Sequence, residues 1–158
     1  MRTKLFSISL VILFLLLMSG CGSDFNTDFD PPPQDTKITD ILPNEINGMK
    51  GEVVEANLRP PFVGYSSKYG SGKIVISVIK ANSKNVADEY FKFAIIPNFD
   101  KMKNYFHGKI NGKWKANGTD ANGRKWYAWV NNNWVFLLNG SDVYYFKMAI
   151  DAFKYIEE

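Results

Sequence analysis

The chain has 158 residues, of which 19 are Lys or Arg and 16 are Asp or Glu, so its formal net charge is +3. The lysines are scattered among the acids rather than gathered in one stripe, and this excludes the usual charge layout of a nucleic-acid-binding protein. A single cysteine and a single histidine also exclude a zinc site built from His and Cys side chains, and a Cys/His catalytic pair.

Residues 1–20 have the layout of an export signal. Residues 1–4 are basic, residues 10–18 form an unbroken apolar run, and residues 19–20 are small. Even counted over residues 5–18, the apolar zone is shorter than the about 20 residues that a helix needs to cross a bilayer. We therefore predict a signal peptide over residues 1–20. An uncleaved anchor helix and an ordinary secreted protein are the alternatives.

The small residues lead directly to Cys21, the only cysteine of the chain. The stretch Ser19-Gly20-Cys21 resembles the lipobox of prokaryotic lipoproteins, with Met18 where that family usually has Leu. The resemblance implies cleavage before Cys21, lipidation of its sulfur with fatty acids such as palmitate, and a protein anchored to the membrane on its extracytoplasmic side. Gly22 replaces the Asp that can retain such proteins in the inner membrane, which favours the outer membrane where the organism has one. Two or three acyl chains give stable anchoring.

Residues 21–36 are predicted to be a flexible tether, because they are polar and acidic and contain Pro31-Pro32-Pro33, which favours an extended backbone. Phe25 and Phe29 are the apolar exceptions. The role considered for their rings is contact with the membrane interface or with a partner. Residues 37–158 are then long enough to fold as a single domain.

The periodicity of apolar residues predicts a series of short elements after the tether. Strands are expected over residues 52–58, 62–69, 73–80, 113–116, 124–130 and 134–138, and helices over residues 83–96 and 142–153. Ser83 and Ser141 are the expected helix caps, Pro97 is expected to end the first helix, and residues 99–106 are expected to be irregular. Asn-Gly pairs, including Asn117-Gly118, are expected to form tight hairpin turns.

The strands over 74–79 and 134–138 are apolar on both faces, so each side of the sheet requires a cover. The two amphipathic helices supply one cover each. We therefore predict an α+β domain, an antiparallel sheet with one helix on each face, which resembles the PsbP-like three-layer sandwich. A two-layer α+β domain with both helices on one side is the alternative.

No catalytic residue, metal site or cofactor site is predicted from the motifs. The stretch over residues 70–73 lacks the first glycine and the hydroxyl residue of a phosphate-binding loop, so we interpret it as a turn. Asp120-Ala121-Asn122-Gly123 mimics part of a calcium loop, but Gly118 and Trp129 stand at its end positions and have no side-chain oxygen. This stretch too is predicted to be a turn.

The preferred functional hypothesis is a lipid-anchored binding module at the cell envelope, with an envelope protein or a glycan as partner and the membrane held through Cys21. Its predicted surface is an aromatic platform of Tyr127, Trp129 and Trp134, with Arg124 as a polar neighbour, because aromatic planes bind sugars, peptides and proteins. The alternative position for these rings is in the core under a helix. The alternative functions are a hydrolase of envelope polymers that uses unidentified carboxylates, and a structural spacer.

Overall fold

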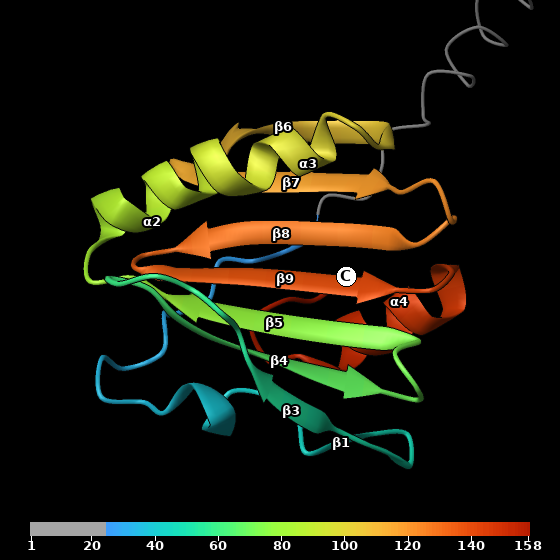
Figure 1. Cartoon of the computed structure of the whole chain (residues 1–158). Coiled ribbons are helices and arrows are strands. Elements are labelled where there is room, and N and C mark those ends of the chain that lie inside the picture. The colour runs from blue at the N-terminus through green and yellow to red at the C-terminus, as the bar shows by residue number, and fades with distance from the viewer. Residues whose placement is uncertain (1–24) are drawn as a thin grey trace, which may run out of the picture.

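The computed structural model describes residues 25–158, and the predicted signal peptide and Cys21 lie outside this range. Its main feature is a seven-stranded antiparallel sheet with the order β3-β4-β5-β9-β8-β7-β6 (Figure 1). The strands are β3 (Glu52–Glu55), β4 (Val63–Tyr69), β5 (Ile74–Lys80), β6 (Lys103–Ile110), β7 (Lys113–Thr119), β8 (Lys125–Asn131) and β9 (Trp134–Gly140). A separate hairpin pairs β1 (Glu45–Ile46) with β2 (Met49–Lys50), and η1 (Ile38–Asp40) is a 3-10 turn before it.

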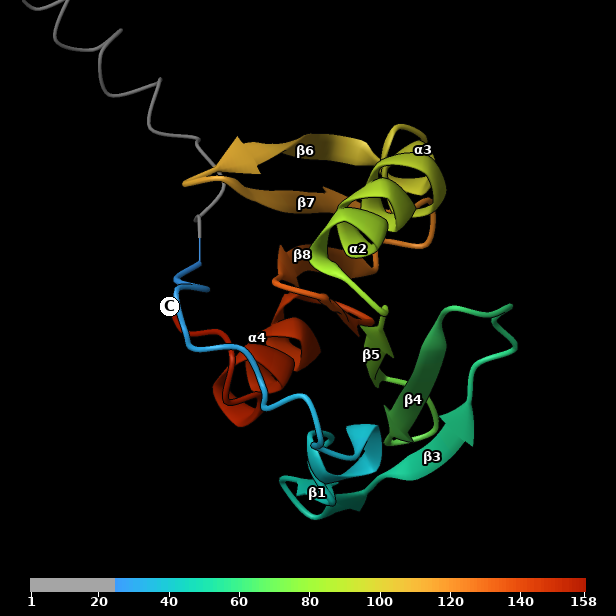
Figure 2. The ribbon, with the colours of Figure 1, turned by 90° about the vertical axis from the view of Figure 1, so that its left-hand side faces the viewer.

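Helices lie on both faces of the main sheet. One face carries a continuous helical segment made of α2 (Lys84–Tyr90), the π-helical turn η2 (Phe91–Ile95) and α3 (Ile96–Phe99). The other face carries α4 (Val143–Ala152), and Figure 2 shows the two helical layers on opposite sides of the strands. The α+β prediction is confirmed. None of the helices in residues 25–158 is both long enough and apolar enough to cross a bilayer.

The alternation of side chains along the central strands builds two hydrophobic cores. In β5, Ile76 and its neighbours two residues away face α4, whereas Ile79 faces α2. The core under α4 is the larger and contains most of the rings, among them Trp129, Trp134 and Phe136. The expectation that β5 and β9 are apolar on both faces is therefore confirmed.

Pro97 does not end the first helix, contrary to the prediction. The helix widens into η2 just before it, and Pro97 then lies in the first turn of α3, where its missing N–H is tolerated. The side chain of Asn98 donates to the carbonyl of Ala94 at 2.8 Å and satisfies a group that the irregular turn exposes. The segment predicted to be irregular over residues 99–106 is also partly a strand, because β6 begins at Lys103.

Two local predictions from polar residues need correction. Asn117-Gly118 is not a turn but lies inside β7, where a Cβ on Gly118 would approach the Met102 side chain to 3.0 Å. The helix cap of α4 is Asp142 rather than Ser141, and its carboxylate accepts a hydrogen bond from the Tyr145 amide at 3.0 Å. Asn111-Gly112, in contrast, forms the predicted turn between β6 and β7, with both residues at positive φ.

Residues 25–36 do not form the predicted flexible tether but pack against the domain. The indole N–H of Trp134 donates to the carbonyl of Pro32 at 3.1 Å, and the side-chain amide of Asn131 donates to the carbonyl of Phe29 at 2.7 Å. Phe25 is only 8% exposed and joins the core under α4. The segment runs past α4 towards the β1 hairpin (Figure 2), so the folded domain includes residues 25–36 and does not begin at residue 37.

This packing predicts that Phe25 contributes to stability as a core residue. We expect Phe25→Ala to lower the free energy of unfolding by about 3 kcal/mol, because the ring leaves a cavity beside its neighbours. The matched control is Phe93→Ala on the exposed side of η2, where Phe93 is 69% exposed and the change should stay within about 0.5 kcal/mol. Urea unfolding of both variants checks this, and equal effects of the two substitutions would favour the flexible tether.

Candidate functional site

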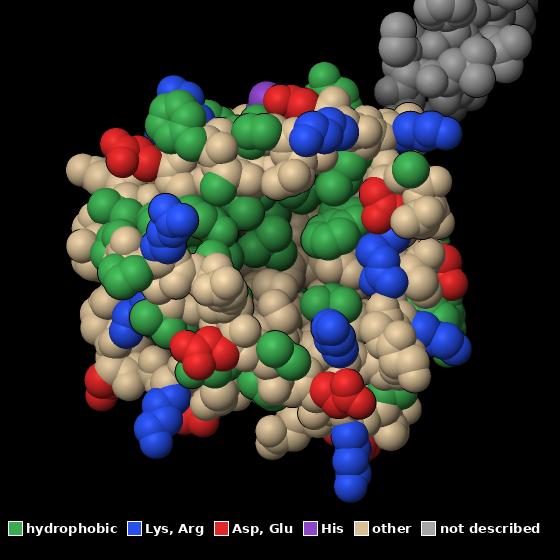
Figure 3. Space-filling view, in the orientation of Figure 1, with side chains coloured by type: hydrophobic (Ala, Val, Ile, Leu, Met, Phe, Trp, Pro, Cys, Tyr) green, Lys and Arg blue, Asp and Glu red, His purple; other side chains and the backbone are tan. Residues whose placement is uncertain are grey.

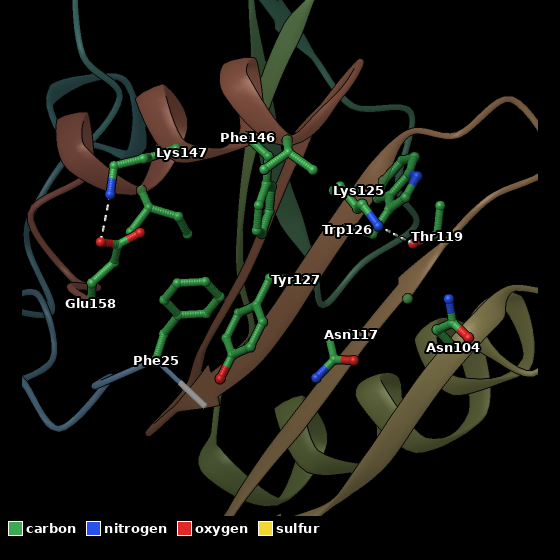
Figure 4. Close-up of a pocket in the computed structure, with 13 residues that line it drawn as sticks. Phe25, Asn104, Asn117, Thr119, Lys125, Trp126, Tyr127, Phe146, Lys147 and Glu158 are labelled. Atoms are coloured by element: carbon green, nitrogen blue, oxygen red, sulfur yellow. Dashed lines mark hydrogen bonds and ion pairs between the residues drawn. The ribbon is translucent and has the colours of Figure 1, made fainter. Parts of the chain in front are cut away.

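A cavity of about 310 Å³ lies on the α4 side of the sheet, between α4, the strands β7 and β8, and the N-terminal segment (Figure 4). Its volume is at the lower end of the range for small-molecule sites in proteins. The C-terminal residue Glu158 and Asn104 of β6 complete its rim. The cavity is therefore bordered by parts of the chain that are far apart in the sequence.

The pairing of β7 with β8 places the polar side chains of the cavity. Asn117 pairs with Tyr127, and Thr119 pairs with Lys125. Paired residues in an antiparallel sheet point to the same face, as do residues two positions apart along one strand. All four side chains therefore point to the α4 side, where they line the cavity.

The apolar lining comes from the N-terminal segment and α4. The ring of Phe25 packs edge-on against Tyr127 at 5.1 Å and against Phe146 at 5.9 Å between ring centroids. Val143 and Ile150 of α4 also line the cavity. The cavity thus offers an apolar surface on one side and hydrogen-bonding groups from the strands on the other.

The two lysines at the cavity differ in their partners. Lys147 forms an ion pair with Glu158 at 2.5 Å, and this hydrogen bond raises the pKa of Lys147 above its usual range. Lys125 donates to the hydroxyl of Thr119 at 2.9 Å, and no carboxylate among residues 25–158 pairs with it. Its positive charge is therefore available to an anionic group in the cavity.

The predicted aromatic platform is wrong, because its rings are in the core. Trp129 and Trp134 are 0% exposed and Tyr127 is also buried. Phe153, which follows α4, packs edge-on against Trp129 at 6.0 Å, and the Pro32 carbonyl binds the Trp134 indole. These rings lie under α4 and the N-terminal segment, whose packing the composition of the strands did not reveal.

Of the four predicted ligand-binding residues, Arg124, Tyr127, Trp129 and Trp134, only Tyr127 borders the cavity. Arg124 lies elsewhere and has a structural role, since its guanidinium donates to the carbonyl of Gly72 at 2.8 Å and to the side chain of Asn139. Asn117, Thr119 and Lys125 were not predicted as site residues from the sequence. Polar residues at every second position of residues 113–119 were the available signal that one face of this strand is not covered as core.

A second cavity, of about 420 Å³, lies on the opposite face between α3 and the turn that joins β7 to β8. Asp120 borders it, but its carboxylate is already occupied: one oxygen accepts from the amides of Asn122 at 2.9 Å and Arg124 at 3.0 Å, and the other accepts from the Trp126 indole at 3.1 Å. Asp120 therefore holds the turn that the sequence predicts.

Among residues 25–158, no pair of acids lines either cavity. Glu158 is the only acidic residue of this range at the first cavity, and Asp120 is the only one at the second. Within residues 25–158, no group of three or more His, Cys, Asp and Glu side chains is arranged to hold a metal ion. The first cavity offers a ligand the ammonium of Lys125, several hydrogen-bonding groups and an apolar wall.

The hydrogen bonds of Asp120 predict a pH-dependent contribution to stability. Burial raises the pKa of Asp120, but the hydrogen bonds from Trp126 and from the backbone amides outweigh this and hold it below its usual value of 3.8. Because the folded-state pKa is depressed, the stabilisation is present above pH 3.8 and is lost as the pH falls through the folded-state pKa.

We therefore expect Asp120→Asn to cost about 1 to 2 kcal/mol of unfolding free energy at neutral pH and to approach the wild type in strongly acidic solution. Urea unfolding of both proteins across this pH range is the measurement. The exposed Asp35 supplies the control, since Asp35→Asn should change stability little at either pH. A constant difference between Asp120→Asn and the wild type would show that the charge of Asp120 has no role.

Comparisons with known proteins do not assign the chain to a group. No family model, no curated protein and no solved structure matches it.

Proposed function

We propose that this chain is a lipid-anchored extracytoplasmic binding protein, and that the cavity under α4 is its ligand site. The observation that carries the proposal is the position of Lys125, a cation without an acidic partner in the described part of the chain, at the border of an apolar cavity. Binding sites for small molecules combine such an apolar lining with a few convergent polar groups.

The lining favours a small anionic amphiphile as ligand. Lys125 matches a carboxylate, sulfonate or phosphate group, and the nearby Asn117 and Thr119 supply further hydrogen-bonding atoms. Phe25 and Phe146 match an apolar group of the ligand. A glycan held on an aromatic platform is not part of the proposal, because Trp129 and Trp134 are buried.

The anchor is proposed from the resemblance of Ser19-Gly20-Cys21 to a lipobox. In this proposal acyl chains on Cys21 hold the domain at the cell membrane, or at the outer membrane where the organism has one. We also propose the PsbP-like sandwich as the finer description of the fold. The order hairpin, helix, antiparallel meander and C-terminal helix supports it, together with helical layers on both faces of the sheet.

The ligand site is tested with two fluorescent probes, the anionic anilinonaphthalene sulfonate and the uncharged Nile red. Lys125→Met removes the charge and keeps the apolar stem, so we expect about tenfold weaker binding of the anionic probe, the loss of a charged hydrogen bond, and little change for Nile red. Asn117→Trp fills the cavity and should weaken both probes. Lys68→Met, at an exposed lysine of β4, is the control. Equal losses in the two Lys→Met variants would refute the site.

The anchor is tested by feeding radioactive palmitate to cells that produce the full chain. We expect label in the wild type and none in Cys21→Ser, and we expect the wild type alone to sediment with membranes, because the acyl chains supply the membrane affinity. Mass spectrometry of the N-terminus of the wild type should find a modified Cys21. An unlabelled wild type that is as soluble as the variant would refute lipidation without affecting the cavity.

A further inference from the structure

The free edge of the sheet at β6 carries an unusual combination of exposed aromatic and basic side chains. Tyr105 is 49% exposed and Phe106 is 44% exposed. Lys101, just before β6, and Lys103, at its start, are exposed and form no ion pair within residues 25–158. We call Lys101, Lys103, Tyr105 and Phe106 the β6 surface. Figure 3 shows hydrophobic, basic and acidic side chains at this end of the molecule, which is uppermost in that view.

Lys101 and Lys103 make the β6 surface positive, and the acids near it have partners of their own. Asp100 forms a hydrogen bond with the ring of His107 at 2.9 Å, which is an ion pair only when the imidazole is protonated. Asp88 of α2 binds Lys84 at 2.7 Å and lies 3.9 Å from Lys109 of β6. Lys101 and Lys103 form no ion pair within residues 25–158.

The two exposed rings lie on opposite faces of the strand, since Tyr105 lies over Gly118 whereas Phe106 pairs with Asn117. The free edge therefore has an exposed ring on each side.

The N-terminal segment contacts the sheet near the same edge, at strand β7. Lys113 of β7 forms an ion pair with Asp28 at 3.0 Å, and the ammonium of Lys115, also on β7, donates to the carbonyl of Phe25 at 3.3 Å. Strand β7 is the neighbour of β6. Phe25 is only four positions after Cys21 in the chain, and four residue steps span at most about 14 Å when fully extended.

The opposite edge of the sheet lies far from this point of contact. Strand β3 is six strand spacings away from β6, or roughly 29 Å at the usual spacing, and Figures 1 and 2 show the two strands at opposite ends. Acyl chains on Cys21 would therefore bring the β6 edge, and not the β3 edge, close to the bilayer. This step rests on the proposed anchor.

We propose that the β6 surface docks on an anionic lipid bilayer. Aromatic rings are favoured at the membrane interface, and each lysine near an anionic surface contributes about 1 kcal/mol of attraction. The alternative occupant of a free edge is another strand, but β6 is poorly suited to pairing. Its register shifts between Lys103 and Phe106, Asn104 has a positive φ of 48°, and lysines lie along it, features that oppose edge-to-edge association.

The test uses the chain from position 21 onwards with Cys21→Ser, so that binding owes nothing to acyl chains; it contains every residue of the described fold. We expect it to cosediment with vesicles that contain phosphatidylglycerol, less with vesicles of phosphatidylcholine alone, and less again at high salt. The double substitution Tyr105→Ser and Phe106→Ser should weaken binding about tenfold, since two rings leave the interface. Lys101→Gln with Lys103→Gln, which changes only exposed charges, should have a similar effect.

The matched control is the double substitution Val53→Ser and Val54→Ser on β3, where both side chains are about half exposed; its vesicle binding should equal that of the parent. Equal binding to both vesicle types, or equal losses in the β6 and β3 variants, would overturn the proposal. Self-association that depends on Tyr105 and Phe106 without vesicle binding would also overturn it, in favour of a second copy of the chain. Because the Cys21→Ser test protein carries no lipid, its failure to bind vesicles would not depend on whether the wild type is labelled with palmitate. The two proposals can therefore fail separately.

Discussion

The fold depends on covering a wide sheet that is apolar on both faces at its centre. Seven strands span roughly 29 Å, whereas α4 has ten residues and is only about 10 Å in diameter. Its contacts are accordingly with β9, β5 and β8. Rings of the central strands such as Trp134 need further cover, and residues 25–36 supply it. The cavity lies where the cover from α4 and the cover from this segment meet.

The N-terminal segment links the domain to the predicted lipidation site and also covers part of the sheet, whereas its composition predicts only the link. The polar and proline-rich sequence indicates an extended chain, and residues 25–36 form no helix, but backbone carbonyls of this segment accept hydrogen bonds from side chains of β8 and β9. An extended strand without a partner strand must satisfy its backbone in some other way. Here Asn131 and Trp134 provide the donors. The consequence is a short connection between Cys21 and the domain, which restricts how far the domain can move from its proposed anchor.

The sequence predicted the parts of the fold that local periodicity determines. The apolar pattern of residues 74–79 and 134–138 correctly indicated strands covered on both sides, and Ser83 caps α2 as expected, its side chain accepting from the Val86 amide at 3.3 Å. The pattern failed for β6, which is mostly exposed and has an irregular register, so that no apolar alternation marks it.

The candidate site was not predictable in the same way. Alternation shows that Asn117 and Thr119 share a face, but it does not show what covers that face. The cover comes from residues at the two ends of the described chain: Phe25 lies against Tyr127, and Asn26 pairs with Glu157, which is 131 residues away. The burial of Trp134 depends on Pro32, 102 residues before it. Contacts of this range follow from tertiary packing, which local sequence patterns do not encode.

The two proposals meet at one strand. Asn104 of β6 lines the cavity, and its neighbours Tyr105 and Phe106 belong to the β6 surface. Phe106 pairs with Asn117, so its side chain points to the same face of the sheet as the cavity. If this strand rests on the bilayer, the cavity lies beside the lipid headgroups. An anionic amphiphile would then reach Lys125 along the β6 surface, whose lysines are positively charged. The two proposals together would favour a ligand that comes from the membrane over one that comes from the surrounding water.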